Sequence, residues 1–122
     1  MKNEEEIAIF EKAEKQLSVF LHEVGELSRK RPNDPVNIFK LEFINVTLKT
    51  LNEFLGSDKP FAGFDCFDSD KLPSNSDVRF ILAQYRESVL RYRTENTTKG
   101  RDYKWHWNIG KKFSKFETKA PD

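Results

Sequence analysis

The side chains best suited to chemistry gather near the carboxyl end of the chain, between residues 99 and 119. This segment holds seven basic residues interleaved with aromatic ones. The residues of the segment that we expect to contact a partner are Lys104, Trp105, Trp107, Lys111 and Lys112. Basic groups neutralise phosphates or carboxylates, and aromatic rings stack on nucleic-acid bases. The segment therefore predicts a binding surface for a nucleic acid or an acidic protein.

A second group of cations follows a helical repeat. Arg79, Arg86 and Arg93 recur every seven residues, which places them on one face of a helix. Guanidinium groups bind carboxylates and phosphates through paired hydrogen bonds. Together with the basic aromatic segment, these arginines indicate a small non-enzymatic interaction module that binds a nucleic acid or an acidic protein.

An arginine and a histidine stand five residues apart in Arg101-Asp102-Tyr103-Lys104-Trp105-His106. This spacing resembles the R-x4-6-H element of the HEPN-type helical ribonucleases. The resemblance covers six residues and implies metal-independent RNA cleavage, often at a dimer interface. It also implies that Arg101 stabilises phosphate charge and that His106 transfers a proton near neutral pH. An endoribonuclease is therefore the alternative to the interaction module.

Metal and cofactor chemistry has little support in the sequence. Two histidines and one cysteine do not provide a zinc site of conventional spacing, and no Gly-rich phosphate loop is present. Asp65, Asp68 and Asp70 lack the glycine and the terminal glutamate of an EF-hand loop. We expect no metal site and no cofactor. A pocket for an apolar small ligand among the eleven phenylalanines is a further alternative function.

The first element that must position these residues is a long helix over residues 4–29. Its apolar stripe alternates in steps of three and four. The stripe consists of Phe10, Ala13, Leu17, Phe20, Val24 and Leu27. Because heptad-like stripes also pair helices between chains, we expect a homodimer.

A second helix is predicted between Asp34, as the capping residue, and Gly56, as the terminating one. Pro35 suits the first helical position because its missing N–H costs nothing there. Two apolar stripes run along this helix, one through Leu41 and Leu48 and another through Phe39, Phe43, Val46 and Phe54. A helix that is apolar on two faces is expected to lie between neighbours.

A third helix is predicted over residues 77–95, capped from Ser74 and with Tyr85 on its inward stripe. In the loop before it, Phe61, Phe64 and Phe67 recur every third residue, which favours one helical turn. Beyond a break at residues 96–100, aromatic and polar residues alternate over 103–109. This period of two is typical of a strand, which would need a hairpin around Gly110 unless it is an extended arm.

The predicted fold class is all-α: an antiparallel three-helix bundle with a basic, aromatic C-terminal arm or short hairpin. Residues 1–98 are expected to form the helical bundle, and residues 99–122 a basic aromatic segment of the same domain. The length of 122 residues fits one domain.

Charge is unevenly distributed although the net charge is only +1. Residues 1–70 carry 9 basic and 14 acidic side chains, whereas residues 71–122 carry 12 and 6. No apolar run is long enough to span a membrane, and the acidic start does not match a secretory signal. With a single cysteine, Cys66, no internal disulfide can form. We therefore expect a cytoplasmic protein without a membrane partner.

Overall fold

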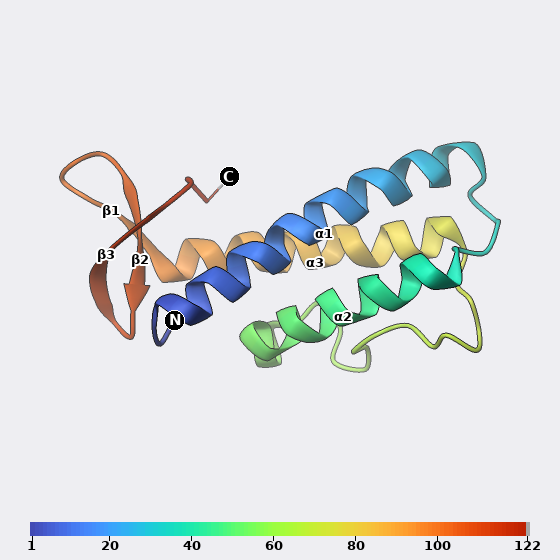
Figure 1. Cartoon of the computed structure of the whole chain (residues 1–122), viewed down its shortest axis with the longest axis horizontal. Helices are drawn as coiled ribbons and strands as arrows, with labels where there is room; N and C mark the ends of the chain where they lie inside the picture. Colours follow the sequence, from blue (N-terminus) through green and yellow to red (C-terminus); the bar gives the residue numbers. More distant parts are fainter. Residues whose placement is uncertain (122) are drawn as a thin grey trace.

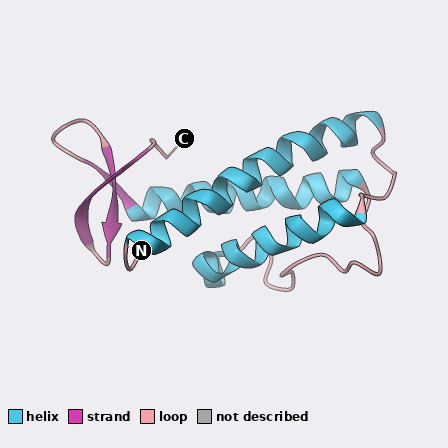
Figure 2. Cartoon of the chain, viewed as in Figure 1, coloured by secondary structure: helices cyan, strands magenta, loops and turns pink. Residues whose placement is uncertain are grey.

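The computed structural model describes residues 1–121, in which three helices lie side by side and a small sheet covers one end of them (Figures 1 and 2). The helices are α1 (Glu4–Lys30), α2 (Ile38–Leu55) and α3 (Asn75–Asn96), with a short 3-10 turn, η1 (Gly56–Asp58), after α2. The strands are β1 (Thr97–Lys99), β2 (Trp105–Ile109) and β3 (Lys112–Thr118). Within residues 1–121, no helix is long and apolar enough to cross a membrane.

The fold is mixed α/β, so the all-α helical bundle predicted from the sequence is wrong. The three strands form an antiparallel sheet in the order β1-β2-β3. Residues 97–99, which we expected to form part of a break, instead pair with residues 105–107 as β1. The predicted strand thus has a partner on each side, and these partners satisfy the backbone groups that a lone strand would leave unpaired. The hairpin between β2 and β3 turns at Gly110, which has a φ of 64°.

Helix α1 has the extent and the buried face that its periodicity predicts. The side chain of Asn3 accepts a hydrogen bond from the backbone N–H of Glu6, and Arg31 caps the other end by donating to the carbonyl of Leu27. The buried apolar residues of α1 are Ile7, Phe10, Ala13, Leu17 and Val24. This stripe packs against α2 and α3 of the same chain, and the homodimer that we expected stays a prediction.

Helix α2 begins at Ile38, three residues later than the predicted first helical residue, Pro35. Its cap is Asn37, whose side chain accepts from the backbone N–H of Lys40 at 3.1 Å. The residues before α2 bond to the segment that precedes α3: the N–H of Val36 donates to the carbonyl of Pro73 at 2.9 Å. This contact and the β-bridge between Pro35 and Ser74 keep residues 35 and 36 out of the helix, and local capping preferences do not reveal them. The predicted end at Gly56 is confirmed, with a φ of 55°.

Only one of the two apolar stripes of α2 is buried. Leu41, Ile44, Leu48, Leu51 and Leu55 contribute to the core. In the second stripe Phe39, Phe43 and Val46 are exposed, and only Phe54 packs against the core, at 5.3 Å from Phe10. The expectation that α2 lies between neighbours is therefore wrong, because α1 and α3 both cover the same side of it.

The loop from residue 59 to residue 73 contains no helix, but one hydrogen-bonded turn forms where the prediction placed it, because the N–H of Phe64 donates to the carbonyl of Phe61 at 3.1 Å. Phe67 is buried because Asn45 on α2 makes two hydrogen bonds, each 2.9 Å, with its backbone N–H and C=O. Phe64 is half-buried against it, whereas Phe61 stacks on Phe80 at the surface.

Helix α3 starts at the predicted cap, since Ser74 accepts from the backbone N–H of Asp77. Tyr85 is fully buried on its inward face and donates to Asn52 Oδ1 at 2.6 Å. Burial raises the pKa of Tyr85 to about 12.

We expect this tyrosine to make the fold sensitive to alkaline pH. The unfolded chain releases the phenol proton near its ordinary pKa of about 10, whereas the folded chain retains it to higher pH. The free energy of unfolding is therefore unaffected below about pH 10 and falls as the pH rises towards about 12. In urea denaturation between about pH 10 and about pH 12, the free energy of unfolding should decline less in Tyr85→Phe than in the unmodified protein. The matched control is Tyr103→Phe, at an 82% exposed position, and an equal decline in both variants would contradict the assignment.

Candidate functional site

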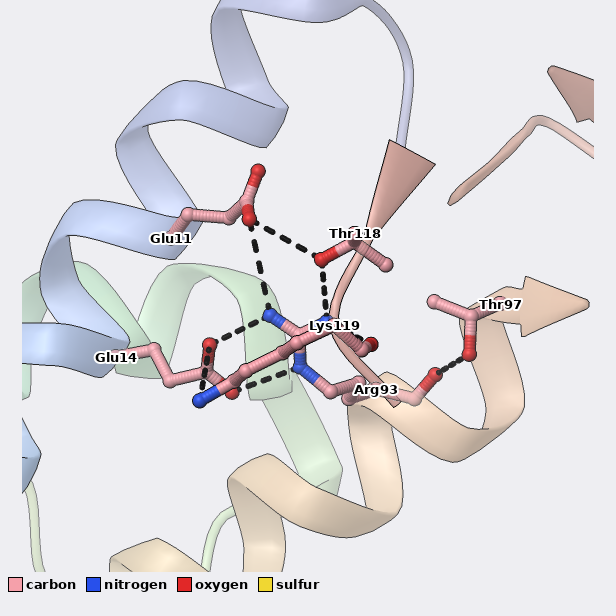
Figure 3. A network of polar contacts seen from close by, with 6 residues as sticks. All are labelled: Glu11, Glu14, Arg93, Thr97, Thr118 and Lys119. Atoms are coloured by element: carbon pink, nitrogen blue, oxygen red, sulfur yellow. Dashed lines mark hydrogen bonds and ion pairs between the residues drawn. The ribbon is translucent and has the colours of Figure 1, made fainter. Parts of the chain in front are cut away.

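Arg93 is a buried residue of the molecule and not part of its surface. Its guanidinium is 0% exposed and makes two hydrogen bonds to the Glu14 carboxylate of α1, at 2.6 and 2.9 Å (Figure 3). It also donates to the Thr118 hydroxyl at 2.6 Å and to the Lys119 carbonyl at 3.1 Å, and it lies 4.8 Å from the ring of Trp107. The predicted partner-binding arginine thus joins α1, α3 and the end of β3.

The two tryptophans of the basic segment do not form an open platform. Trp107 is fully buried and packs edge-on against Phe10 at 5.3 Å, while Trp105 is half-buried. Tyr103 and Phe113 are the exposed aromatic residues of this region. The aromatic surface that we expected to stack on nucleic-acid bases is therefore mostly buried in the core.

The predicted lysines remain on the surface, at the end of the molecule that carries the sheet. Lys111 and Lys112 lie at the β2–β3 turn, and Lys104 precedes β2 and pairs with Glu117 at 3.5 Å. Arg79 lies near the opposite end of α3. At 1.5 Å per residue, the 17 residues from Arg79 to the end of the helix separate it from the sheet by about 25 Å. The structure therefore divides the predicted basic surface into separate parts.

Arg79 and Arg86 line a groove between α1 and α3 whose volume is about 590 Å³. Leu21, Phe80 and Ala83 supply its apolar lining. Gly25 faces the groove from α1, and a Cβ added there would lie 3.7 Å from Nε of Arg79. A larger side chain at this position would occupy the space that now exposes the guanidinium.

The groove contains cations that the protein itself does not neutralise. Among residues 1–121, no carboxylate lies within 4.0 Å of the charged nitrogens of Arg79 or Arg86. Arg29, on the opposite wall, is paired with Glu26, and Glu87 adds a second carboxylate to the lining. The site therefore offers two exposed guanidinium groups beside apolar and acidic side chains.

A second, smaller cavity of about 250 Å³ continues this groove towards the sheet. The two share Leu21 and Arg86, and the second extends along α1 to Glu14 and to residues 119–121. From residue 14 to residue 29 of α1 the combined surface runs for about 20 Å. That length accommodates about six residues of an extended peptide.

Arg101 and His106 line another cavity, of about 480 Å³, at the β1–β2 loop. His106 Nε2 lies 3.0 Å from Asp102 Oδ2, and Nδ1 is buried with no hydrogen-bond partner in the described chain. Hydrogen bonding from the Lys104 backbone and from His106 lowers the pKa of Asp102. Nδ1 is therefore closed to a substrate, and Nε2 could exchange a proton with one only after Asp102 moves away. The pair also lies on a loop and a strand, whereas the HEPN-type element is presented by a helix.

The sequence analysis did not identify Glu14, which pairs with Arg93, or Gly25, which lies beside Arg79. Glu14 follows a residue of the apolar stripe of α1 and reads as part of its charged face, yet it is nearly buried. Gly25 carries no signal in the sequence other than its presence inside a helix, where glycine is unfavourable.

Comparison with protein-family models, with curated proteins and with solved structures finds no match.

Proposed function

We propose that the protein is a non-enzymatic interaction module of the cytosol that binds an acidic segment of a protein partner. The segment would lie in the α1–α3 groove, with Arg79 and Arg86 as the residues that bind its carboxylates. The observation that carries this proposal is the presence of two exposed arginines, without carboxylate partners in residues 1–121, along one apolar groove.

An acidic peptide fits this groove better than a nucleic acid does. The groove has an apolar lining that suits the aliphatic side chains of a peptide, which a phosphate backbone lacks. The net charge of +1 is also far from the basic footprint of nucleic-acid binders. A reducing compartment is supported by the single thiol, Cys66, which is unpaired and half-buried.

The other candidate functions have less support. Ribonuclease chemistry would require a substrate to displace Asp102 from Nε2 of His106, because Nδ1 is buried, and the Arg101–His106 pair is not presented by a helix. An apolar ligand would have to use the open groove near Phe20, Phe39 and Phe43, and nothing in that groove selects one ligand.

Fluorescence anisotropy with a labelled peptide of alternating Glu and Leu, about six residues long, tests the proposal. We expect saturable binding that weakens with salt, and a loss of about tenfold or more in the Arg79→Gln/Arg86→Gln double variant, equivalent to about 1.4 kcal/mol. The matched control is Lys111→Gln/Lys112→Gln, which removes the same charge from the sheet. This control should bind the peptide as the unmodified protein does.

Two results would reject the groove as the peptide site. One is an equal loss of affinity in both double variants, which would indicate a general charge effect. The other is tighter binding to a single-stranded oligonucleotide of equal charge than to the peptide, with a steep salt dependence.

A further inference from the structure

The loop between β1 and β2 folds back so that the carboxylate of Asp102 contacts the buried imidazole of His106. The backbone N–H of Lys104 donates to Asp102 Oδ1 at 3.0 Å, and the backbone N–H of Gly100 donates to the Lys104 carbonyl at 2.8 Å. Tyr103, at the turn, has a φ of 63°, a left-handed conformation that few residues other than glycine adopt. This tight turn directs Asp102 back to Nε2 of His106.

Gly100 makes this close approach sterically feasible. A Cβ added at residue 100 would lie 2.7 Å from Asp102 Oδ1, 3.0 Å from the Phe113 ring and 3.2 Å from the His106 ring. The carboxylate and the imidazole therefore occupy the space that any other side chain at residue 100 would need.

A third donor comes from the neighbouring strand. Glu117 on β3 is the register partner of His106 on β2. The donor atoms of Asp102, His106 and Glu117 all lie within 4.8 Å of one another. Two half-exposed carboxylates thus flank one buried imidazole at the surface of the sheet.

We propose that Asp102, His106 and Glu117 bind a divalent transition-metal ion, with Zn²⁺ as the best match. Imidazole nitrogen is a ligand for zinc and its neighbours, whereas Mg²⁺ and Ca²⁺ prefer oxygen ligands alone. Three protein ligands leave a coordination position for water, as in open zinc sites. This site is independent of the groove and of the function proposed for it.

Binding requires a small rearrangement on the exposed side of the cluster. Zinc bonds of about 2.0–2.1 Å place tetrahedral ligands about 3.4 Å apart. Asp102 Oδ2 is already 3.0 Å from Nε2 of His106 and only has to give up this contact to the ion, whereas Glu117 must approach by up to about 1.4 Å. Lys104 Nζ lies 3.5 Å from Glu117 Oε1 and must move away. His106 need not move, because it is buried and the Phe113 ring lies 4.5 Å from its own.

The second nitrogen of His106 limits the expected affinity. Metal-binding histidines generally donate this N–H to a carboxylate or carbonyl, but Nδ1 of His106 has no partner within residues 1–121. We therefore expect zinc affinity about 10- to 100-fold below that of sites that have such an acceptor.

Isothermal titration with Zn²⁺ alone, together with Co²⁺ absorption spectra, tests the site on the full chain. We expect one saturable ion, a visible Co²⁺ spectrum that Zn²⁺ abolishes, and an affinity lowered about tenfold or more in Asp102→Asn and in Glu117→Gln. Gly100→Ala should also weaken binding, because it displaces Asp102 without removing a donor. Lys104→Gln should instead tighten binding about two- to fivefold, the typical strength of a surface ion pair.

Glu53→Gln, on the exposed face of α2, is the matched control and should leave the affinity unchanged. The carboxylate variants change exposed side chains, and circular dichroism will show that they are folded. Absence of saturable Zn²⁺ binding would overturn the proposal. So would an affinity that Asp102→Asn and Glu117→Gln leave unchanged.

Discussion

Replacing Glu14 with glutamine is expected to lower the free energy of unfolding by about 3 kcal/mol. The substitution leaves the Arg93 guanidinium, which is 0% exposed, without its principal counter-charge. Removing one member of a buried ion pair commonly costs about 3–5 kcal/mol, because the remaining charge stays desolvated. The lower end applies because Glu11 lies 3.9 Å from the same guanidinium and compensates in part.

Urea denaturation followed by circular dichroism measures this effect. Glu5→Gln removes the same charge from an exposed position of α1 and should change stability by less than about 0.5 kcal/mol. Glu14→Met combined with Arg93→Met should recover much of the loss, because apolar residues can replace a buried pair at little cost. A loss below about 1 kcal/mol in Glu14→Gln would show that water reaches Arg93.

Replacing Trp107 with alanine is expected to cost about 3–5 kcal/mol, as large aromatic truncations in cores do. The indole packs on Phe10 of α1 and beneath the Arg93 guanidinium, so it joins the sheet to the helices. Its loss creates a cavity at this junction and removes the cation–π contact as well.

Thermal and urea denaturation of Trp107→Ala test whether the sheet is essential to the fold. Tyr103→Ala, also an aromatic truncation in the sheet region but at an exposed position, should change stability by less than about 0.5 kcal/mol. Equal losses in the two variants would contradict a special role of Trp107. By the same reasoning, a chain that ends at residue 98 should be much less stable than the full chain, because Trp107 contributes to the common core.

Helices α1 and α3 could be predicted because their signals are local. An apolar repeat at helical spacing and a capping side chain act over one or two turns, and Ser74 caps α3 where the sequence indicates. The start of α2 could not be predicted in this way. There, the hydrogen bond from Val36 to Pro73 joins segments 37 residues apart and outweighs the capping preference of Asp34 and Pro35.

In the candidate sites too, local patterns could be predicted and long-range contacts could not. The spacing of Arg79, Arg86 and Arg93 correctly places them along one helix, but it gives no information on what lies opposite each of them. Glu14 of α1 meets Arg93, whereas Gly25 of α1 lies beside Arg79 and leaves the guanidinium exposed. One arginine consequently stabilises the fold, whereas Arg79 and Arg86 are exposed.

Local patterns predict the three helices and the strand at 105–109, because each of these depends on neighbours within a few residues, and the composition alone gives the uneven charge. Tertiary contacts produce the mixed α/β fold, the burial of Trp107 and Arg93, and the proximity of Asp102, His106 and Glu117. These features depend on which segments pack together. Burial and ion pairing are properties of the surroundings in space: Phe10 packs on Trp107 from 97 positions away, and Glu14 pairs with Arg93 from 79 positions away.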